Sequence, residues 1–138
     1  MFRLRNRRAV GAVVAIAGIF TVQPAFSADL TGPEIQKLLS GTTIYLEFAT
    51  DNPVTGGGGG VMAYTTDGKV STKFPNGSSL KGTWVVKDNT SCITWDGQPP
   101  APCTRFDKTG EVITSINTAS GKPRGKITKT APGNPEKL

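Results

Sequence analysis

The sequence contains no histidine. Because histidine is the side chain that gains and loses a proton near neutral pH, its absence excludes Ser-His-Asp and Cys-His catalysis and imidazole metal ligands. Cysteine is scarce as well, and the spacing of Cys92 and Cys103 excludes a CxxC redox pair. The sequence also lacks an Asp-x-Asp-x-Asp-Gly calcium loop. We therefore predict neither a metal ion nor another cofactor.

Long apolar runs are missing too, apart from an uncharged run from Ala9 to Val22, which falls short of the ~20 residues that span a bilayer. The basic residues that precede it are Arg3, Arg5, Arg7 and Arg8. Ala25 and Ser27 follow in the −3 and −1 positions of a secretory cleavage site. We predict a signal peptide over residues 1–27, no membrane span after its removal, and a periplasmic or secreted location. Cleavage after Ala28 and an uncleaved membrane anchor are the alternatives.

Most of the positive net charge of the chain lies in the predicted signal peptide and is lost when the peptide is removed. The chain has a formal net charge of +6, and four of its 16 basic residues but none of its 10 acidic residues lie in residues 1–27, which leaves +2. The high isoelectric point thus reflects targeting, and we expect no nucleic-acid partner. Residues 131–138 contain Pro132, Gly133 and Pro135 and are expected to form a flexible basic tail. Contact of the C-terminal basic residues with a polyanion or an anionic membrane is the alternative.

Residues 28–130 have the pattern of a single β domain. Thr43–Phe48 alternates apolar with polar side chains, which is typical of a half-buried strand. Asp67-Gly68 and Asp88-Asn89 separate further strand-like runs and predict two hairpins. The predicted fold class is mainly β, a small antiparallel barrel or sandwich formed by a meander of six to seven strands.

One short N-terminal helix precedes the predicted strands. Thr31 and Glu34 have capping-box spacing at its start, and Gly41 is placed to end it. So short a helix is unstable alone, and we expect its apolar face to pack against the sheet.

Glycine is abundant at two places that invite interpretation. The run from Gly56 to Gly60 lacks the lysine and the following helix of a phosphate-binding loop, so we expect a flexible loop. Gly82 lies inside a strand-like run and predicts a close backbone approach or a bulge.

The two cysteines are expected to form a disulfide, because an exported protein matures in an oxidising compartment. Closing their loop of about a dozen residues stabilises a fold by about 3 kcal/mol. The loop contains the stretch Gln98, Pro99, Pro100 and Ala101, which we predict as an interaction loop. A stiff loop loses little entropy when it binds. A connector that merely closes the hairpin is the alternative.

Other chemistry-bearing side chains have ordinary structural explanations. Trp84 and Trp95 are expected in the core beside the disulfide, with a ligand-stacking platform as the alternative. Carboxylate catalysis stays formally open through residues such as Glu47 and Asp96. Most other aspartates lie in predicted turns, where aspartate hydrogen-bonds its own backbone.

The framework motifs of the chain occur in a characteristic order. They are Leu30-Thr31-Gly32, Glu34-Ile35, Leu38-Leu39-Ser40-Gly41, Asp67-Gly68, Gly82-x-Trp84-x-Val86, Cys92-x-x-Trp95 and Cys103. This order resembles small secreted proteins of alphaproteobacteria, rhizobia among them, that are grouped as domains of unknown function. The resemblance implies export, a single β domain and the disulfide. It implies no activity, because it brings no catalytic or binding residues with it.

Three hypotheses of function follow from the sequence. The first is a non-catalytic exported binding or interaction protein, with an unidentified protein or envelope ligand as its partner. The second is a protein inhibitor of an envelope or host hydrolase, because small disulfide-bonded β domains present rigid loops well. The third, which the sequence favours least, is a carboxylate-dependent enzyme.

Overall fold

The computed structural model describes residues 18, 22–23 and 26–138 of the chain. The predicted signal peptide, residues 1–27, therefore lies almost entirely outside the described residues. The helix is α1 Gly32–Leu39, and the strands are β1 Ser27–Asp29, β2 Thr42–Phe48, β3 Gly58–Tyr64, β4 Lys69–Lys73, β5 Ser79–Lys87, β6 Thr90–Trp95, β7 Thr104–Thr109, β8 Val112–Asn117 and β9 Pro123–Pro132. None of the described helical residues form a span that is long and apolar enough to cross a membrane.

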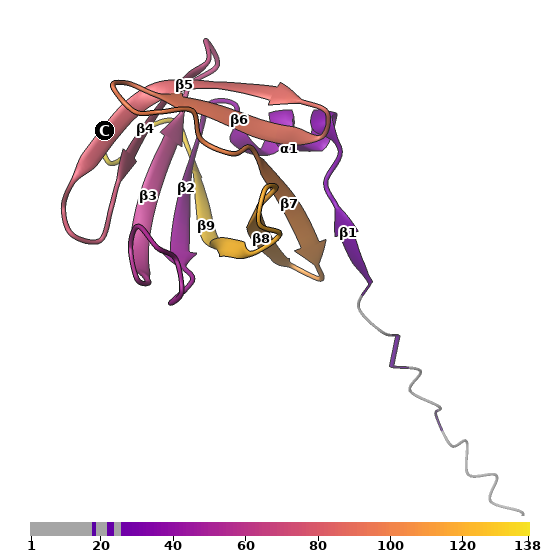
Figure 1. Ribbon diagram of the computed structural model, residues 1–138. Coiled ribbons are helices and arrows are strands. Elements are labelled where there is room, and N and C mark those ends of the chain that lie inside the picture. Colours follow the sequence, from indigo (N-terminus) through magenta and orange to yellow (C-terminus); the bar gives the residue numbers. More distant parts are fainter. Residues whose placement is uncertain (1–17, 19–21, 24–25) are drawn as a thin grey trace, which may run out of the picture.

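Eight strands close into an antiparallel barrel (Figure 1). Strands β2 to β9 pair in sequence order, and β9 pairs back to β2. Strand β1 lies outside this ring and pairs with β7. The predicted mainly β meander and its barrel form are confirmed. The predicted count of six to seven strands is wrong, because the described chain has nine.

The strands that sequence reasoning missed are β1 and β7, and both are short and polar. We expected a turn at Asp107 to Gly110, but Asp107 and Thr109 belong to β7 and pair with β8 on one side and β1 on the other. Of the residues in β7, only Phe106 is buried. A strand that presents one apolar side chain has no alternation to detect, and its pairing partners alone stabilise it.

The hairpin of β5 and β6 turns where the sequence predicted. Asp88 and Asn89 have φ of 49° and 58°, the left-handed conformation that a two-residue hairpin turn requires. The Asn89 Oδ1 also accepts a hydrogen bond from the Gly32 N–H at 2.6 Å. The turn therefore fixes the start of α1 as well as the two strands.

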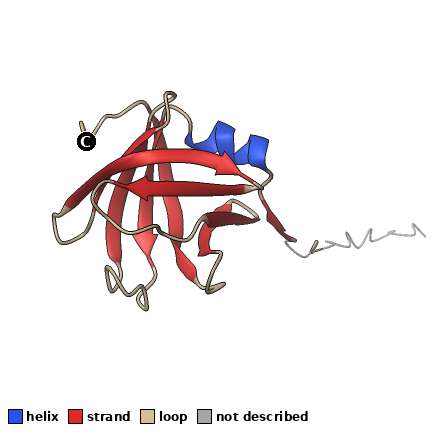
Figure 2. Ribbon diagram, turned by 45° about the horizontal axis from the view of Figure 1, so that its top comes forward, coloured by secondary structure: helices blue, strands red, loops and turns tan. Residues whose placement is uncertain are grey.

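Helix α1 closes one end of the barrel, beside β2, β5 and β6 (Figure 2). The predicted capping box is present, since the Thr31 N–H donates to Glu34 Oε2 at 2.7 Å. Ile35 and Leu39 are 0% exposed and join the core with Trp84. In an up-and-down barrel the connections alternate between the ends, so the loops 49–57, 74–78 and 96–103 lie at the end away from the helix.

Two glycines allow close contacts inside the barrel. A Cβ on Gly82 would lie 2.2 Å from the Thr94 carbonyl oxygen, which confirms the predicted close approach. A Cβ on Gly60 would lie 2.3 Å from the Phe48 ring. Gly58 to Gly60 begin β3, so the glycine run that we expected to be a loop is partly a strand.

The C-terminal residues follow the outer face of β2. Strand β9 extends through Pro132, two residues into the segment 131–138. Beyond it, the Gly133 N–H donates to the Gly41 carbonyl at 2.8 Å, and the Thr43 hydroxyl donates to the Gly133 carbonyl at 2.6 Å. Tyr45 donates its hydroxyl proton to Glu136 Oε1 at 2.6 Å. These contacts bury Thr43, although it faces away from the barrel interior.

Candidate functional site

The interior of the barrel holds a cavity of about 400 Å³. Its wall is mainly apolar and includes Leu46, Phe48, Met62, Phe74, Ile93 and Trp95. These side chains reach the cavity because alternate residues of a strand point to the same face. An eight-stranded barrel has just enough internal width for packed side chains or for one small ligand.

Space remains inside this barrel because short side chains stand at several inward positions. Thr72, Ser91 and Ser115 are buried and line the cavity. Gly60 and Gly125 are also buried on the strands that form the wall. Leucine or phenylalanine at such positions would fill the interior, as they fill the helix-closed end of the barrel.

The mouth of the cavity is formed by loops at the end away from the helix. Val54, from the loop between β2 and β3, lines the cavity and is 74% exposed. A second hollow of about 250 Å³ shares Val54, Phe74 and Gln98 with the first.

The predicted interaction loop forms part of this mouth. All four residues named from the sequence, Gln98, Pro99, Pro100 and Ala101, line the cavity. The first three are exposed and Ala101 is half-buried. Their role in an interaction stays a prediction, and the structure places them in the lining of the cavity.

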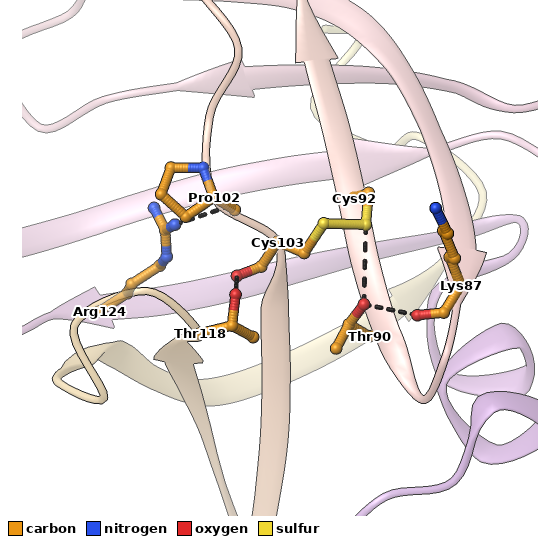
Figure 3. The surroundings of a disulfide bond; sticks show 7 residues. All are labelled: Lys87, Thr90, Cys92, Pro102, Cys103, Thr118 and Arg124. Atoms are coloured by element: carbon orange, nitrogen blue, oxygen red, sulfur yellow. Dashed lines mark hydrogen bonds between the residues drawn. A yellow bond between two sulfur atoms is a disulfide. The ribbon is translucent and has the colours of Figure 1, made fainter.

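A disulfide joins the two ends of the segment that contains this loop. Cys92 and Cys103 lie at disulfide distance, with an S–S length of 2.06 Å and Cα atoms 4.3 Å apart (Figure 3). Cys92 belongs to β6, and Cys103 immediately precedes β7. The bond therefore joins β6 to β7 across the loop, rather than holding the β5–β6 hairpin together.

Two buried polar atoms of the described residues have no hydrogen-bond partner, and both belong to residues that line the cavity. They are Ser91 Oγ and Arg124 Nε. Ser91 is 2% exposed. Buried polar groups are nearly always hydrogen-bonded, so an unpartnered pair facing one cavity needs an explanation. The other hydroxyls of the wall differ: Ser115 donates to the Gly125 carbonyl at 3.1 Å, and Thr72 donates to the Val61 carbonyl at 3.0 Å.

Among the residues that the structure describes, Arg124 is the only charged one that lines the cavity. It lies beside the irregularity where the β8–β9 register shifts. Its Nη2 donates to the Pro102 carbonyl at 2.9 Å, which ties it to the mouth loop (Figure 3). Among the described residues the single salt bridge joins Arg105 to Asp29, so Arg124 has no carboxylate partner there.

Burial shapes the electrostatics of this wall. Desolvation lowers the pKa of Arg124, and Tyr64 opposes that effect. Burial also raises the pKa of Tyr64 far above its usual range, against the positive charge of Arg124. Both phenol and guanidinium therefore keep their protons at neutral pH. The Tyr64 hydroxyl donates only to Met62 Sδ, at 3.6 Å.

The two tryptophans have different environments. Trp84 is buried in the core, where its ring meets Tyr64 edge-on at 5.4 Å and its Nε1 donates to the Thr65 carbonyl at 3.1 Å. This confirms the core prediction for Trp84. Trp95 is only partly buried, packs against the core and lines the cavity.

The carboxylates considered for catalysis lie elsewhere. Glu47 and Asp96 are exposed, and neither lines the cavity. The described part of the chain brings no three His, Cys, Asp or Glu side chains together in a group that could hold a metal ion.

Sequence reasoning missed the two unpartnered polar residues of the wall. Ser91 had a signal, because it occupies the same strand face as Ile93 and Trp95, and a polar residue in an apolar alternation is unusual. No sequence pattern could have indicated Arg124. Its side chain lines the cavity beside a register shift at the start of β9, and such a shift cannot be recognised from the sequence.

Comparisons with protein-family models, with curated proteins and with solved structures give no match for this chain.

Proposed function

We propose that this chain is an exported, non-catalytic binding protein that holds a small, largely apolar ligand inside its barrel. The observation that carries the proposal is the cavity of about 400 Å³ with a mostly apolar wall. Ligand sites are typically concave, about 300–1,000 Å³ in volume, and apolar with a few polar groups.

The two ends of the barrel support this function in different ways. Helix α1 and its buried residues Ile35 and Leu39 fill one end. The other end carries the mouth loops, of which one contains three prolines and is anchored by the disulfide. A stiff mouth limits the entropy lost when a ligand is enclosed.

Export rests on two features that agree with each other. The N-terminal residues have the pattern of a secretory signal, and the two cysteines lie at disulfide distance. Disulfides persist in oxidising compartments such as the periplasm and the extracellular medium. A ligand of the cell envelope or of the surroundings is accordingly the ligand we expect.

The test is a titration of the purified protein with N-phenyl-1-naphthylamine, a neutral apolar dye whose emission rises in apolar surroundings. We expect saturable binding at one site. The Ile93→Trp variant adds bulk to the cavity wall and should abolish it. Thr94→Trp adds the same bulk at the next residue, which is exposed, and should leave it unchanged. Non-saturable binding, or equal loss in both variants while both stay folded by circular dichroism, would refute the proposal.

A second function is favoured by the exposure of Gln98, Pro99 and Pro100 on the anchored loop. Rigid exposed loops are the segments that protein inhibitors insert into hydrolase clefts. Lysozymes and proteases assayed with and without a micromolar excess of the protein test this alternative. Inhibition that disappears when Gln98 is replaced by glutamate would support it, and activity unchanged across the panel would exclude it for those enzymes.

A further inference from the structure

The described lining of the cavity contains one charged residue, Arg124, and no residue of opposite charge. No carboxylate of the described chain pairs with Arg124. Arg124 is half-buried and its Nε is fully buried, so part of a positive charge is removed from water without being paired, which is unfavourable. A ligand that brings one negative charge would offset this desolvation at Arg124.

The donors that remain free on Arg124 indicate the shape of that negative group. A guanidinium carries five N–H donors in a planar fork, and the described residues give this one a single acceptor, the Pro102 carbonyl. Nε is buried and has no partner. A planar fork matches the two oxygens of a carboxylate, which accept two parallel hydrogen bonds.

Ser91 provides a second, independent observation in the same cavity. Its side chain is 2% exposed, and its hydroxyl has no partner among the described residues. The neighbouring hydroxyls of Ser115 and Thr72 both donate to backbone carbonyls. A free hydroxyl on a mainly apolar wall indicates that a polar ligand group completes its hydrogen bonding.

The rest of the cavity wall indicates the chemistry of the part of the ligand that is attached to its charged group. Leu46, Phe48, Met62, Ile93 and Trp95 offer apolar contacts and no further charge. A doubly charged phosphate would leave one negative charge uncompensated inside the barrel. A monoanion with an apolar tail satisfies both parts of the cavity.

We infer that the ligand is an alkyl carboxylate, with the chemistry of a fatty acid, whose carboxylate pairs with Arg124 and accepts a hydrogen bond from Ser91 while its tail fills the apolar part of the cavity. This inference rests on the proposed function, because it names the ligand class of the same cavity. It assigns Arg124 and Ser91 as head-group residues and Trp95 as a tail contact.

The test compares decanoic acid with 1-decanol at pH 7, each displacing N-phenyl-1-naphthylamine from the unmodified protein. The two probes share a nine-carbon alkyl tail and differ in the head group, which is a charged carboxylate in decanoate and a neutral alcohol in decanol. We expect decanoate to bind about tenfold more tightly or better, as charge-assisted hydrogen bonds are worth more than neutral ones. Decanol that binds as tightly as decanoate would overturn the inference and leave the proposed function standing. If decanoate, decanol and the dye all fail to bind, both the inference and the proposed function are wrong.

Variants locate the head group. Arg124→Met should remove the preference for decanoate over decanol, and Ser91→Ala should weaken decanoate binding several-fold. Arg105→Met is the matched control, because Arg105 pairs with Asp29 and does not line the cavity. Should Arg124→Met fail to fold, Arg124→Lys keeps the charge and loses the fork, and it should bind decanoate more weakly than the unmodified protein. A decanoate preference that survives the loss of Arg124 would refute the assignment.

Discussion

Ser91 and Thr104 form the single register pair that joins β6 to β7 in the described sheet. Every other neighbouring pair of strands in the barrel shares at least four such residue pairs. The Cys92–Cys103 disulfide lies one residue away from this pair on each strand. The covalent bond therefore closes the barrel at the place where hydrogen bonding is weakest, directly below the mouth loop.

Replacing both cysteines by serine should destabilise the fold by about 3 kcal/mol, the value for closing a loop of this length. Urea denaturation of the Cys92→Ser/Cys103→Ser variant measures this change. Adding reductant to the unmodified protein is the control, and it should lower the unfolding midpoint by a similar amount. A midpoint that neither treatment moves would mean that the barrel closes without the bond.

A substitution at Gly82 tests how closely β5 packs on β6. Gly82→Ala should lower the free energy of unfolding by about 1–3 kcal/mol, the usual range for overpacking, because the new Cβ would lie 2.2 Å from the Thr94 carbonyl oxygen. Gly59→Ala is the matched control in β3, since its Cβ would meet nothing nearer than 3.9 Å. Equal effects of the two substitutions would contradict this packing.

The turn residue Asn89 has two separable roles. Asn89→Gly keeps the left-handed backbone but removes the hydrogen bond to the Gly32 N–H, so it should destabilise the fold by about 1 kcal/mol. Asn89→Ala also strains the backbone and should be worse by roughly 1 kcal/mol more. Thermal unfolding of both variants tests the order, and an alanine variant as stable as the glycine variant would contradict it.

The Glu34 carboxylate should make the free energy of unfolding depend on pH. The hydrogen bond from the Thr31 N–H lowers the pKa of the Glu34 carboxyl below its usual value. Its contribution is therefore complete above the pKa of the unfolded chain and is lost as the pH falls through the lower pKa of the folded state. The stability difference between the unmodified protein and Glu34→Gln should shrink from pH 7 to pH 3. Glu111→Gln, at an exposed turn, is the control. A difference that stays constant over this range would contradict the cap.

Local signals in the sequence were enough for the helix, the hairpins and the cysteine pair. Thr31 with Glu34 predicts a helix start, and Asp88-Asn89 predicts a turn, because each feature depends on neighbouring residues. Strand β7 could not be predicted from local signals, because Phe106 is its only buried residue. Its pairing with β1 and β8 stabilises it instead.

The cavity could not be predicted in the same way. Its two unpartnered polar residues belong to β6 and to the start of β9, which the closing of the barrel brings to one interior. Alternation could place Ser91 on an inward face, but it could not show that Arg124 would lie on the same wall. Short side chains at inward positions, such as Ser115, likewise indicate empty space only once their neighbours are known.

The most direct test of a ligand inside the barrel is the NMR signal of the Met62 methyl group. Met62 lines the cavity, and the only other methionine is Met1, in the predicted signal peptide. When protein labelled with ¹³C at the methionine methyl is titrated with decanoate, the Met62 signal should shift in a saturable manner. A Met62 signal that stays unchanged while decanoate binds would place the ligand outside the barrel and contradict the proposed site.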